Sequence, residues 1–250
     1  MVKVIKNKKV HEYFLDRDRP FKNEANNWWY KGNTERFQAV YFNILQKKPI
    51  NHLTSLNKKN PKIMILGAAL GLDIIKLKEE LLKNKVNPQI DVFSLTKIKN
   101  TIFPKELKQN KKEVLRTIEN DYSTGVYFEN IALNKSLAEK IKFKYDLVVA
   151  PSSVSVFTEH PEYNAFQSAL LLNKGGKAYV EINVEHYLVP RSLGGGVNYN
   201  VTKHFPFMIK AVNRLIKSYN TKNKTNLEFK CDFVFYNKTS APYFEIERLN

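Results

Sequence analysis

From residue 62 onward, the hydrophobic and polar positions of this chain alternate between strand-like runs and amphipathic helical patterns. Residues 62–66 form an apolar run of strand length, and apolar residues then recur at helical spacing from Leu72 to Leu82. Comparable runs predict further strands over 90–95, 126–133, 145–152, 177–184, 227–236 and 242–249, and helices over 160–172 and 206–219.

Strands that alternate with helices predict an α/β fold with a doubly wound, mostly parallel sheet of seven strands and right-handed crossovers. The last two strands follow each other with only a short connection, which predicts an antiparallel terminal hairpin. We expect residues 1–60 to form a basic, largely helical N-terminal extension and residues 61–250 to form one Rossmann-like domain.

The charge of the chain is strongly unbalanced, with a formal net charge of +17. Such an excess favours a polyanionic partner, nucleic acid before a membrane surface, although a composition biased toward Lys and Asn would also produce a solvated basic surface. The densest basic segment is "KIKNTIFPKELKQNKKEVLR" at 97–116, with seven basic residues against two acids. The residues predicted to contact RNA phosphates are Lys97, Lys99, Lys108, Lys111, Lys112 and Arg116.

Two adjacent tryptophans, Trp28 and Trp29, stand in the segment "EANNWWYKG". They suit either of two roles, stacking on an RNA base or packing the extension onto the core. The single cysteine, Cys231, allows no intramolecular disulfide and no cysteine-built zinc site, and no metal site is expected. We also expect no membrane span and no signal peptide, hence an intracellular, reducing and cytoplasmic location.

The stretch "KIMILGAALGLDIIKL" at 62–77 places a turn with Gly67 and Gly71 between a strand and a helix. Such a turn presents backbone amides and a helix N-terminus to a ligand, or it simply joins the two elements. A dinucleotide fingerprint would need glycine at the positions of Gly67, Ala69 and Leu72, so two of its three glycines are missing. A P-loop is excluded because no Gly-Lys-Ser/Thr follows.

The spacing Gly67-x-Ala69-x-Gly71 resembles the first motif of class I S-adenosylmethionine (SAM) methyltransferases, and "LGAALG" is similar to the "LGAAPGG" variant of RNA 2′-O-methyltransferases. The resemblance covers about residues 60–185, because "YDLVVAPSS" and "LLLNKGGKAYVEI" look like the family's fourth-strand and fifth-strand motifs. It implies SAM as cofactor, and a side chain added at Gly71 is expected to enter ligand space. The implied cofactor-binding residues are Gly67, Ala68, Ala69, Gly71, Asp91, Asn130, Ala150 and Pro151.

The acceptor chemistry is less defined. RNA 2′-O-methyltransferases resemble one another in a Lys-Asp-Lys-Glu tetrad, but here the fourth strand ends in Ala150 and Pro151, and Glu181 stands where a lysine is expected. Cap guanine methyltransferases need no general base. The segment "EANNWWYKG" is similar to their upstream Asn-Asn-Trp element, and Asp73 is similar to the acid that follows their last glycine. Glu181 and Ser152 are the catalytic candidates.

The sequence therefore predicts a SAM-dependent methyltransferase acting on RNA of cap or ribosomal type. The alternative is a catalytically inactive domain of the same fold, serving as an RNA-binding or stimulatory subunit of a partner protein.

Overall fold

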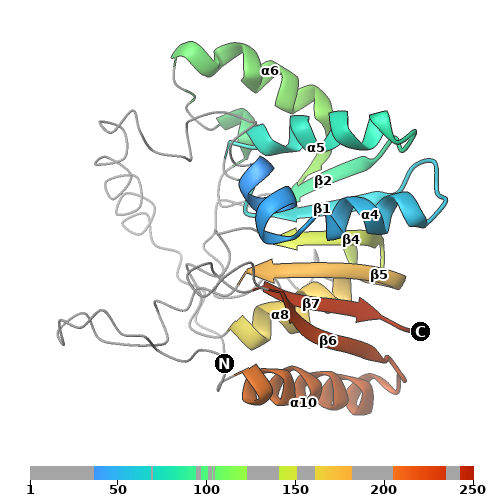
Figure 1. The fold of residues 1–250 in the computed structure, drawn as a ribbon. Coiled ribbons are helices and arrows are strands. Elements are labelled where there is room, and N and C mark those ends of the chain that lie inside the picture. Colours follow the sequence, from blue (N-terminus) through green and yellow to red (C-terminus); the bar gives the residue numbers. More distant parts are fainter. Residues whose placement is uncertain are drawn as a thin grey trace, which may run out of the picture.

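The computed structural model describes residues 37–68, 70–93, 97–100, 103, 105–122, 141–150, 161–181, 205–234 and 243–250. Within them, a seven-stranded sheet has the order β3-β2-β1-β4-β5-β7-β6 (Figure 1). Strands β1 to β5 run parallel, whereas β7 is antiparallel to both β5 and β6. The predicted sheet with its antiparallel terminal hairpin is confirmed. The strands are β1 (Lys62–Leu66), β2 (Gln89–Phe93), β3 (Ile118–Asp121), β4 (Tyr145–Ala150), β5 (Leu172–Glu181), β6 (Phe229–Val234) and β7 (Tyr243–Arg248).

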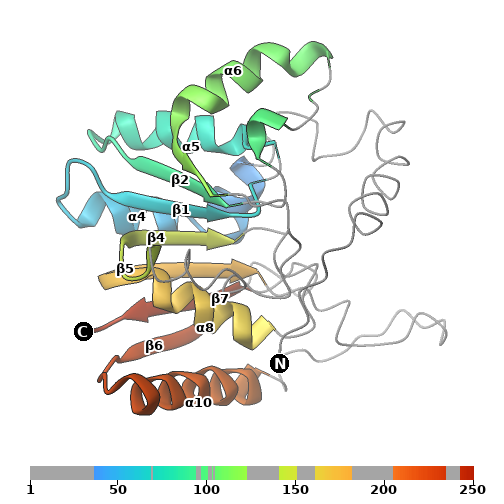
Figure 2. The ribbon, with the colours of Figure 1, turned by 180° about the vertical axis from the view of Figure 1, so that it is seen from behind.

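Helices cover both faces of the sheet, which is why its central strands read as continuous apolar runs. All six positions of β4 are buried, as are the last four of β1. Figures 1 and 2 show the two faces from opposite sides. One face carries η1 (Gln38–Ile44), α4 (Lys48–Ser55), α5 (Leu72–Lys83) and α6 (Lys108–Thr117), and the other carries α8 (Pro161–Leu171) and α10 (Phe205–Asn223).

No helix in the described part of the chain combines the length and the apolar character that crossing a membrane requires.

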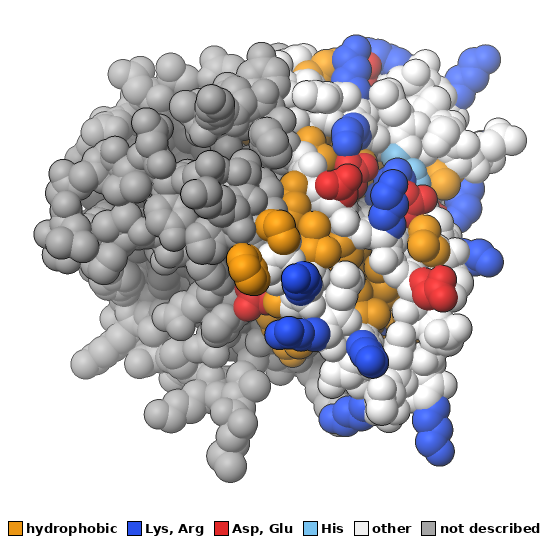
Figure 3. All heavy atoms as spheres, turned by 60° about the horizontal axis from the view of Figure 1, so that its bottom comes forward, with side chains coloured by type: hydrophobic (Ala, Val, Ile, Leu, Met, Phe, Trp, Pro, Cys, Tyr) orange, Lys and Arg blue, Asp and Glu red, His pale blue; other side chains and the backbone are white. Residues whose placement is uncertain are grey.

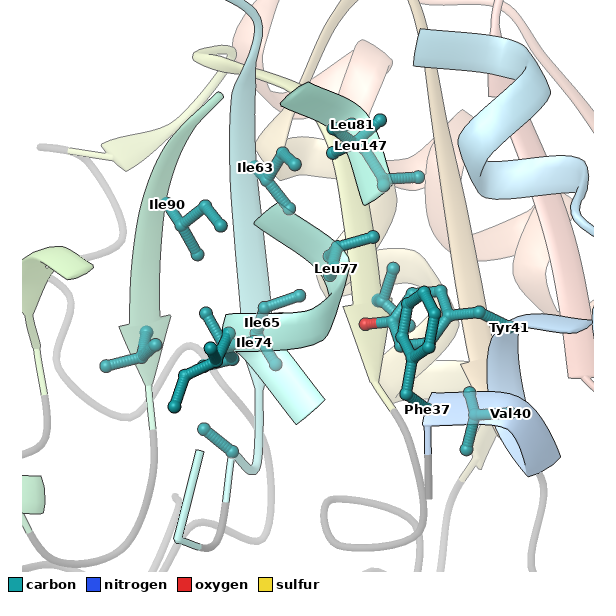
Figure 4. Close-up of a cluster of buried hydrophobic side chains, with 14 of the residues drawn as sticks. Phe37, Val40, Tyr41, Ile63, Ile65, Ile74, Leu77, Leu81, Ile90 and Leu147 are labelled. Carbon is teal, nitrogen blue, oxygen red and sulfur yellow. The ribbon is translucent and has the colours of Figure 1, made fainter. Parts of the chain in front are cut away.

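The segment before β1 packs into the same core as the sheet. Phe37, Val40 and Tyr41 are buried, and Figure 4 shows them beside the side chains that α5 and β4 contribute. Leu53 of α4 is fully buried in the same cluster. The boundary expected at residue 60 stays a prediction, but residues 37–56 share a core with the domain that follows them. Residues 1–36 lie outside the described part.

The third strand of the sheet is Ile118–Asp121, not 126–133 as the apolar pattern predicted. It pairs in parallel with β2, and the backbone N–H of Tyr122 continues the pairing by donating to the Val92 carbonyl at 2.9 Å. The apolar pattern missed β3 because it is a short strand at the edge of the sheet. An edge strand with two exposed polar residues lacks the apolar run of a central strand. Residues 126–133 lie outside the described part.

Strand β5 begins earlier than predicted, at Leu172, and includes the Gly-Gly pair expected to precede it. Gly175 has a φ of +75°, which glycine adopts without strain. A Cβ at Gly176 would lie 2.7 Å from the carbonyl oxygen of Tyr145 in β4. This pair is therefore required for the irregular close pairing of β4 with β5.

A buried carboxylate closes the amino edge of the sheet, where the parallel strands begin. Asp146 in β4 accepts hydrogen bonds from the Lys58 ammonium at 2.6 Å, the Lys62 backbone N–H at 2.8 Å and the Asn173 amide at 2.6 Å. Burial alone would raise the pKa of Asp146, but these three donors outweigh it and lower the pKa below its usual value. The Nε2 atom of His52 in α4 lies 3.0 Å from the backbone carbonyl oxygen of Asp146, within hydrogen-bond distance. This cluster ties α4 and the start of β1 to β4 and β5.

Candidate functional site

The strand order creates a switch point between β1 and β4. From β1 the chain continues outward to β2 and β3, whereas from β4 it continues in the opposite direction to β5. In open α/β sheets, ligands bind beyond the carboxyl ends of the strands at this place, because the connecting segments diverge there. Gly67 directly follows β1, and Ala150 ends β4. Both predicted cofactor residues therefore stand at the switch point.

The turn from β1 into α5 contains two residues in the left-handed conformation, Gly67 with a φ of +74° and Gly71 with a φ of +69°. The N–H of Gly67 donates to the Phe93 carbonyl at 2.6 Å, and that of Gly71 donates to the Ala68 carbonyl at 2.6 Å. Helix α5 then begins at Leu72 with Gly71 as its N-cap. The turn directs the N-terminus of a twelve-residue helix toward the carboxyl edge, where its dipole favours a negatively charged group.

Gly71 has a packing role that the sequence did not indicate. A Cβ at this position would lie 2.8 Å from Cγ1 of Val114 in α6 and 3.2 Å from Cδ1 of Ile98. Both side chains are fully buried. The expectation that a side chain at position 71 would enter ligand space was therefore wrong, because that direction leads into the core behind the turn.

Asp73 is fully buried in the first turn of α5. A carboxylate at this place interacts favourably with the positive end of the helix dipole. Position 65, two residues before Gly67, is a fully buried isoleucine of the core.

Asp91 lies in the middle of β2, two residues before its carboxyl end at Phe93. This places it about 7 Å short of the edge at the usual rise per residue. One carboxylate oxygen accepts a hydrogen bond from the Tyr145 hydroxyl at 2.7 Å, and the other accepts one from the Asn120 amide at 2.8 Å. Asp91 thus joins β2 to the adjacent strand β3 and, across β1, to β4. A ribose contact through Asp91 stays a prediction, and it would compete with both bonds.

Tyr145 has its own second contact, since its hydroxyl also hydrogen-bonds to that of Tyr122. Burial, together with the nearby Asp91 carboxylate, raises the pKa of both tyrosines. Tyr145 gives its only hydroxyl proton to Asp91, so Tyr122 must be the donor in the contact between the two tyrosines.

Sequence reasoning missed Asp121, the last residue of β3. Its carboxylate accepts a hydrogen bond from the backbone N–H of Ile98 at 2.7 Å, which anchors η2 (Ile98–Asn100) to the carboxyl edge. The signal was an acid at the end of a strand, and it was hidden because the third strand was assigned to 126–133.

Glu181 ends β5 at the same edge, directly opposite Tyr243 of β7. The hydroxyl of the fully buried Tyr243 donates to the Glu181 carboxylate at 2.9 Å. This bond fixes the orientation of a carboxylate at the edge where ligands are expected. The other catalytic candidate, Ser152, lies outside the described residues, as do Ala69, Asn130, Pro151, Trp28 and Trp29.

The predicted basic residues lie on α6 and on η2 before it. Lys108, Lys112 and Arg116 are spaced four residues apart, so they form one exposed row along α6, which we call the α6 row. Lys111 behaves differently: its ammonium donates to the Lys99 carbonyl at 2.8 Å and lies 5.5 Å from the Phe103 ring centroid. Lys97 and Lys99 are exposed on and beside η2.

No protein-family model and no curated protein sequence matches this chain. Solved structures with a similar fold include a putative class I SAM-dependent methyltransferase from Listeria monocytogenes, with a TM-score of 0.46, 12% identity, and 96% of this chain and 67% of that chain covered. The CMeT domain of the citrinin polyketide synthase gives a TM-score of 0.46 and 12% identity over 98% of this chain and 57% of that chain.

A putative protein-L-isoaspartate O-methyltransferase from Plasmodium falciparum, solved in complex with S-adenosyl-L-homocysteine, gives a TM-score of 0.39 and 20% identity. The alignment covers 60% of each chain. This chain thus spans less than two thirds of the length of the Plasmodium and polyketide-synthase structures. These likenesses concern the fold alone.

The strand order, with an antiparallel β7 inserted between β5 and β6, is that of the class I methyltransferase fold, so the fold implied by the sequence resemblance is confirmed. The described residues fit SAM at the β1–α5 turn, because two left-handed glycines and a helix N-terminus suit its carboxylate end.

Proposed function

We propose that this chain is a SAM-dependent methyltransferase that acts on RNA of cap or ribosomal type. The observation that carries the proposal is the glycine turn between β1 and α5, which lies at the switch point of a sheet with the class I methyltransferase strand order. The fold alone hosts many chemistries, so the proposal depends on this site rather than on the architecture.

When bound, SAM supplies a methyl group carried on a positively charged sulfur. The chain's own contribution begins at the turn: the Gly67–Gly71 backbone and the first turn of α5 bind the carboxylate end of the cofactor and fix its orientation. Ala150 ends β4 at the same switch point, and its side chain is small. Positioning of two reactants in this way supplies much of the rate enhancement where the acceptor is already nucleophilic.

The acceptor is placed by the end of β5. The Glu181 carboxylate, held by Tyr243, is suited to accept hydrogen bonds from the N–H groups of an RNA base. This supports a ring nitrogen as the methylated atom, because such an atom needs orientation and not a general base. Glu181 then acts by positioning the base.

RNA as the acceptor is supported by charge. The α6 row presents three cations about 6 Å apart along one helix face, as expected from four residues of helical rise. No carboxylate of the described residues lies within ion-pair distance of these three side chains. Contacts of this kind give salt-dependent binding that does not discriminate between sequences.

The proposal includes an intracellular, reducing location. Cys231 is half-buried in β6, and burial raises the pKa of its thiol to about 11. A thiol with this pKa stays protonated at neutral pH, so Cys231 is not a reactive nucleophile.

The cofactor site is tested by isothermal titration with SAM and S-adenosylhomocysteine on the wild type and on two matched variants, Gly67→Ala and Gly175→Ala. The two glycines have nearly equal φ values, +74° and +75°, so alanine introduces a similar backbone strain at each. We expect Gly67→Ala to lower affinity at least tenfold and Gly175→Ala, at the amino edge, to leave it unchanged. Equal affinity in both variants would place the cofactor elsewhere.

The role of Glu181 is tested by Glu181→Gln with radiolabelled SAM and RNA. We expect methyl transfer to stay within about tenfold of the wild type, since a glutamine still accepts a hydrogen bond and positioning supplies the rate. Loss of transfer by more than a hundredfold with SAM affinity intact would instead make Glu181 a general base.

The second candidate function is a catalytically inactive domain that binds RNA or stimulates a partner enzyme. The position of Asp91, away from the edge and already bonded to Tyr145 and Asn120, favours it. Absence of SAM binding by the wild type at millimolar concentration, together with RNA binding, would establish this second function.

A further inference from the structure

Helix α10 has an exposed side that the sequence analysis did not single out. Its buried side is formed by Met208, Val212 and Ile216, which pack against the sheet. Residues 207, 210, 214 and 217 recur at three- and four-residue spacing, so they share one face on the opposite side of the helix. All four side chains are exposed: Phe207, Lys210, Arg214 and Lys217, here called the α10 stripe.

The α10 stripe combines an aromatic ring with cations. Phe207 is 68% exposed, the largest value among the exposed large hydrophobic side chains of the described residues. The Lys210 ammonium lies 6.0 Å from the centroid of this ring. Helix α10 contains no Asp or Glu in its 19 residues, and no carboxylate of the described part lies within ion-pair distance of Lys210, Arg214 or Lys217. The surface is therefore positive and carries a ring that water solvates poorly.

The α10 stripe starts on the carboxyl-edge side of the sheet, beside β6. Strand β5 ends at the carboxyl edge, and α10 then runs back to the amino edge, where β6 begins (Figure 1). Phe207 stands in the first turn of α10, so the aromatic end of the α10 stripe is the end nearer to this edge. From Phe207 to Lys217 the α10 stripe extends about 15 Å along the helix. Figure 3, which brings the side of α10 forward, shows basic and hydrophobic side chains next to each other.

We infer that the α10 stripe binds single-stranded RNA and guides it toward the carboxyl edge of the sheet. Phe207 stacks on a base, and Lys210, Arg214 and Lys217 contact successive phosphates. The inference rests on the proposed action on RNA, and it assigns the binding surface to a helix that is separate from the α6 row.

Single-stranded RNA is the partner that suits this combination best. Exposed aromatic rings bind nucleic acid by stacking on bases, which a duplex keeps inside its helix, whereas neighbouring cations bind the backbone. The α6 row has cations but no exposed aromatic side chain: Phe103, the ring that Lys111 contacts, is only 7% exposed. The α6 row therefore suits phosphates of any strand, and the α10 stripe suits unpaired nucleotides.

The inference is tested by fluorescence anisotropy with a labelled oligouridylate and with an RNA duplex of equal length, over a series of salt concentrations. The variants are Phe207→Ala, Phe207→Trp and the triple variant Lys210→Glu/Arg214→Glu/Lys217→Glu. The triple variant Lys108→Glu/Lys112→Glu/Arg116→Glu is the matched control, because it makes the same change in charge on the other basic helix. Circular dichroism establishes that each variant is folded.

We expect Phe207→Ala to weaken oligouridylate binding roughly tenfold, which is within the range for loss of one stacked base, and to leave duplex binding unchanged. Phe207→Trp retains a stacking ring and should bind like the wild type. The α10 triple variant should weaken oligouridylate binding more than the α6 triple variant, and should reduce the salt slope by about two if three phosphates are contacted.

The inference is overturned if Phe207→Ala binds oligouridylate as the wild type does, or if the two triple variants are indistinguishable. If RNA binding survives every α10 change, the α10 stripe is instead a surface for a protein partner. This result would not affect the proposed RNA methylation. No binding of either RNA by the wild type would overturn both this inference and RNA as the acceptor. The SAM titrations are independent of both results.

Discussion

The two edges of the sheet use their polar groups in different ways. At the amino edge, the buried Asp146 accepts hydrogen bonds from three donors of the same chain, and a helix packs over it. At the carboxyl edge, the described turn between β1 and α5 uses glycine backbone and a helix N-terminus instead of a charged cluster. The polar groups of the first arrangement satisfy one another and serve stability, whereas the second is the turn that we propose binds SAM.

The same contrast holds for single glycines. Gly71 and Gly175 have similar positive φ values, +69° and +75°, and stand at opposite edges. A Cβ at Gly71 would meet three side chains within 3.4 Å, but a Cβ at Gly175 would meet nothing within 4 Å. Gly71 is thus required for conformation and for packing, whereas Gly175 is required for conformation alone.

Removal of the amino-edge carboxylate should have the largest effect. Asp146→Ala leaves the Asn173 amide and the Lys62 N–H without their acceptor in a buried place, and we expect the free energy of unfolding to fall by about 3 kcal/mol. Urea denaturation measures the change. Lys58→Met is the control: its ammonium is half exposed, so loss of this ion pair should cost no more than about 1 kcal/mol. Equal losses in both variants would mean that the ion pair itself dominates.

The glycine pair gives the next largest effect. Gly175→Ala should cost about 1 kcal/mol, since only the left-handed backbone is strained. Gly71→Ala should cost at least about 2 kcal/mol, because the new Cβ would lie 2.8 Å from Cγ1 of Val114, which must also move away. Thermal unfolding of the two variants measures the difference. Gly71→Ala/Val114→Ala should recover part of the packing cost, and no recovery would show that the contact with α6 is not its source.

Asp91 offers a subtler test, since it belongs to the carboxyl half of β2 but is bonded like an amino-edge residue. Asp91→Asn replaces the charged acceptor of two hydrogen bonds with a neutral amide, although a turn of the exposed Asn120 amide can still pair the two side chains, so we expect a loss of about 1 kcal/mol. The exchange Asp91→Asn/Asn120→Asp restores a carboxylate to the pair and should recover part of it.

Isothermal titration with SAM on the same Asp91 variants separates the two roles of this residue. If Asp91 has only a structural role, the affinity for SAM is unchanged in both variants. If Asp91 binds the ribose of SAM, both variants lose affinity, including the exchanged variant that regains stability.

The sequence predicted most of the sheet because the buried parallel strands have a strong apolar signal. Residues 62–66 match β1, and the expected terminal hairpin is β6 and β7. It failed at β3, where an edge strand needs few apolar residues, and the error concealed Asp121 at the carboxyl edge. It also gave no sign that Cβ of position 71 would point into the core, because that direction depends on how α6 packs behind the turn.

The α10 stripe was within reach of sequence reasoning, because Phe207, Lys210, Arg214 and Lys217 share one face of a helix that was predicted over 206–219. The charge density of 97–116 indicated α6 instead. A count of basic residues does not show which of them a helix exposes beside an aromatic ring, whereas the periodicity of the buried positions does.

Acid should weaken the amino edge through His52 before it does so through Asp146, with the smallest effect of this series. Burial lowers the pKa of His52 below its usual 6.5, so the folded protein favours the neutral ring. The unfolded chain binds this proton first, and stability from His52 is therefore complete above about pH 6.5 and declines as the pH falls below it. The pKa of Asp146 is also lowered, so its contribution is complete above about pH 4 and declines only in stronger acid.

Urea midpoints at pH 7.5 and 5.5 should thus differ more for the wild type than for His52→Gln, whose side-chain amide can still donate to the Asp146 carbonyl. Identical pH dependence in the two proteins would show that the titration lies in other histidines, and that the amino edge is insensitive to pH in this range.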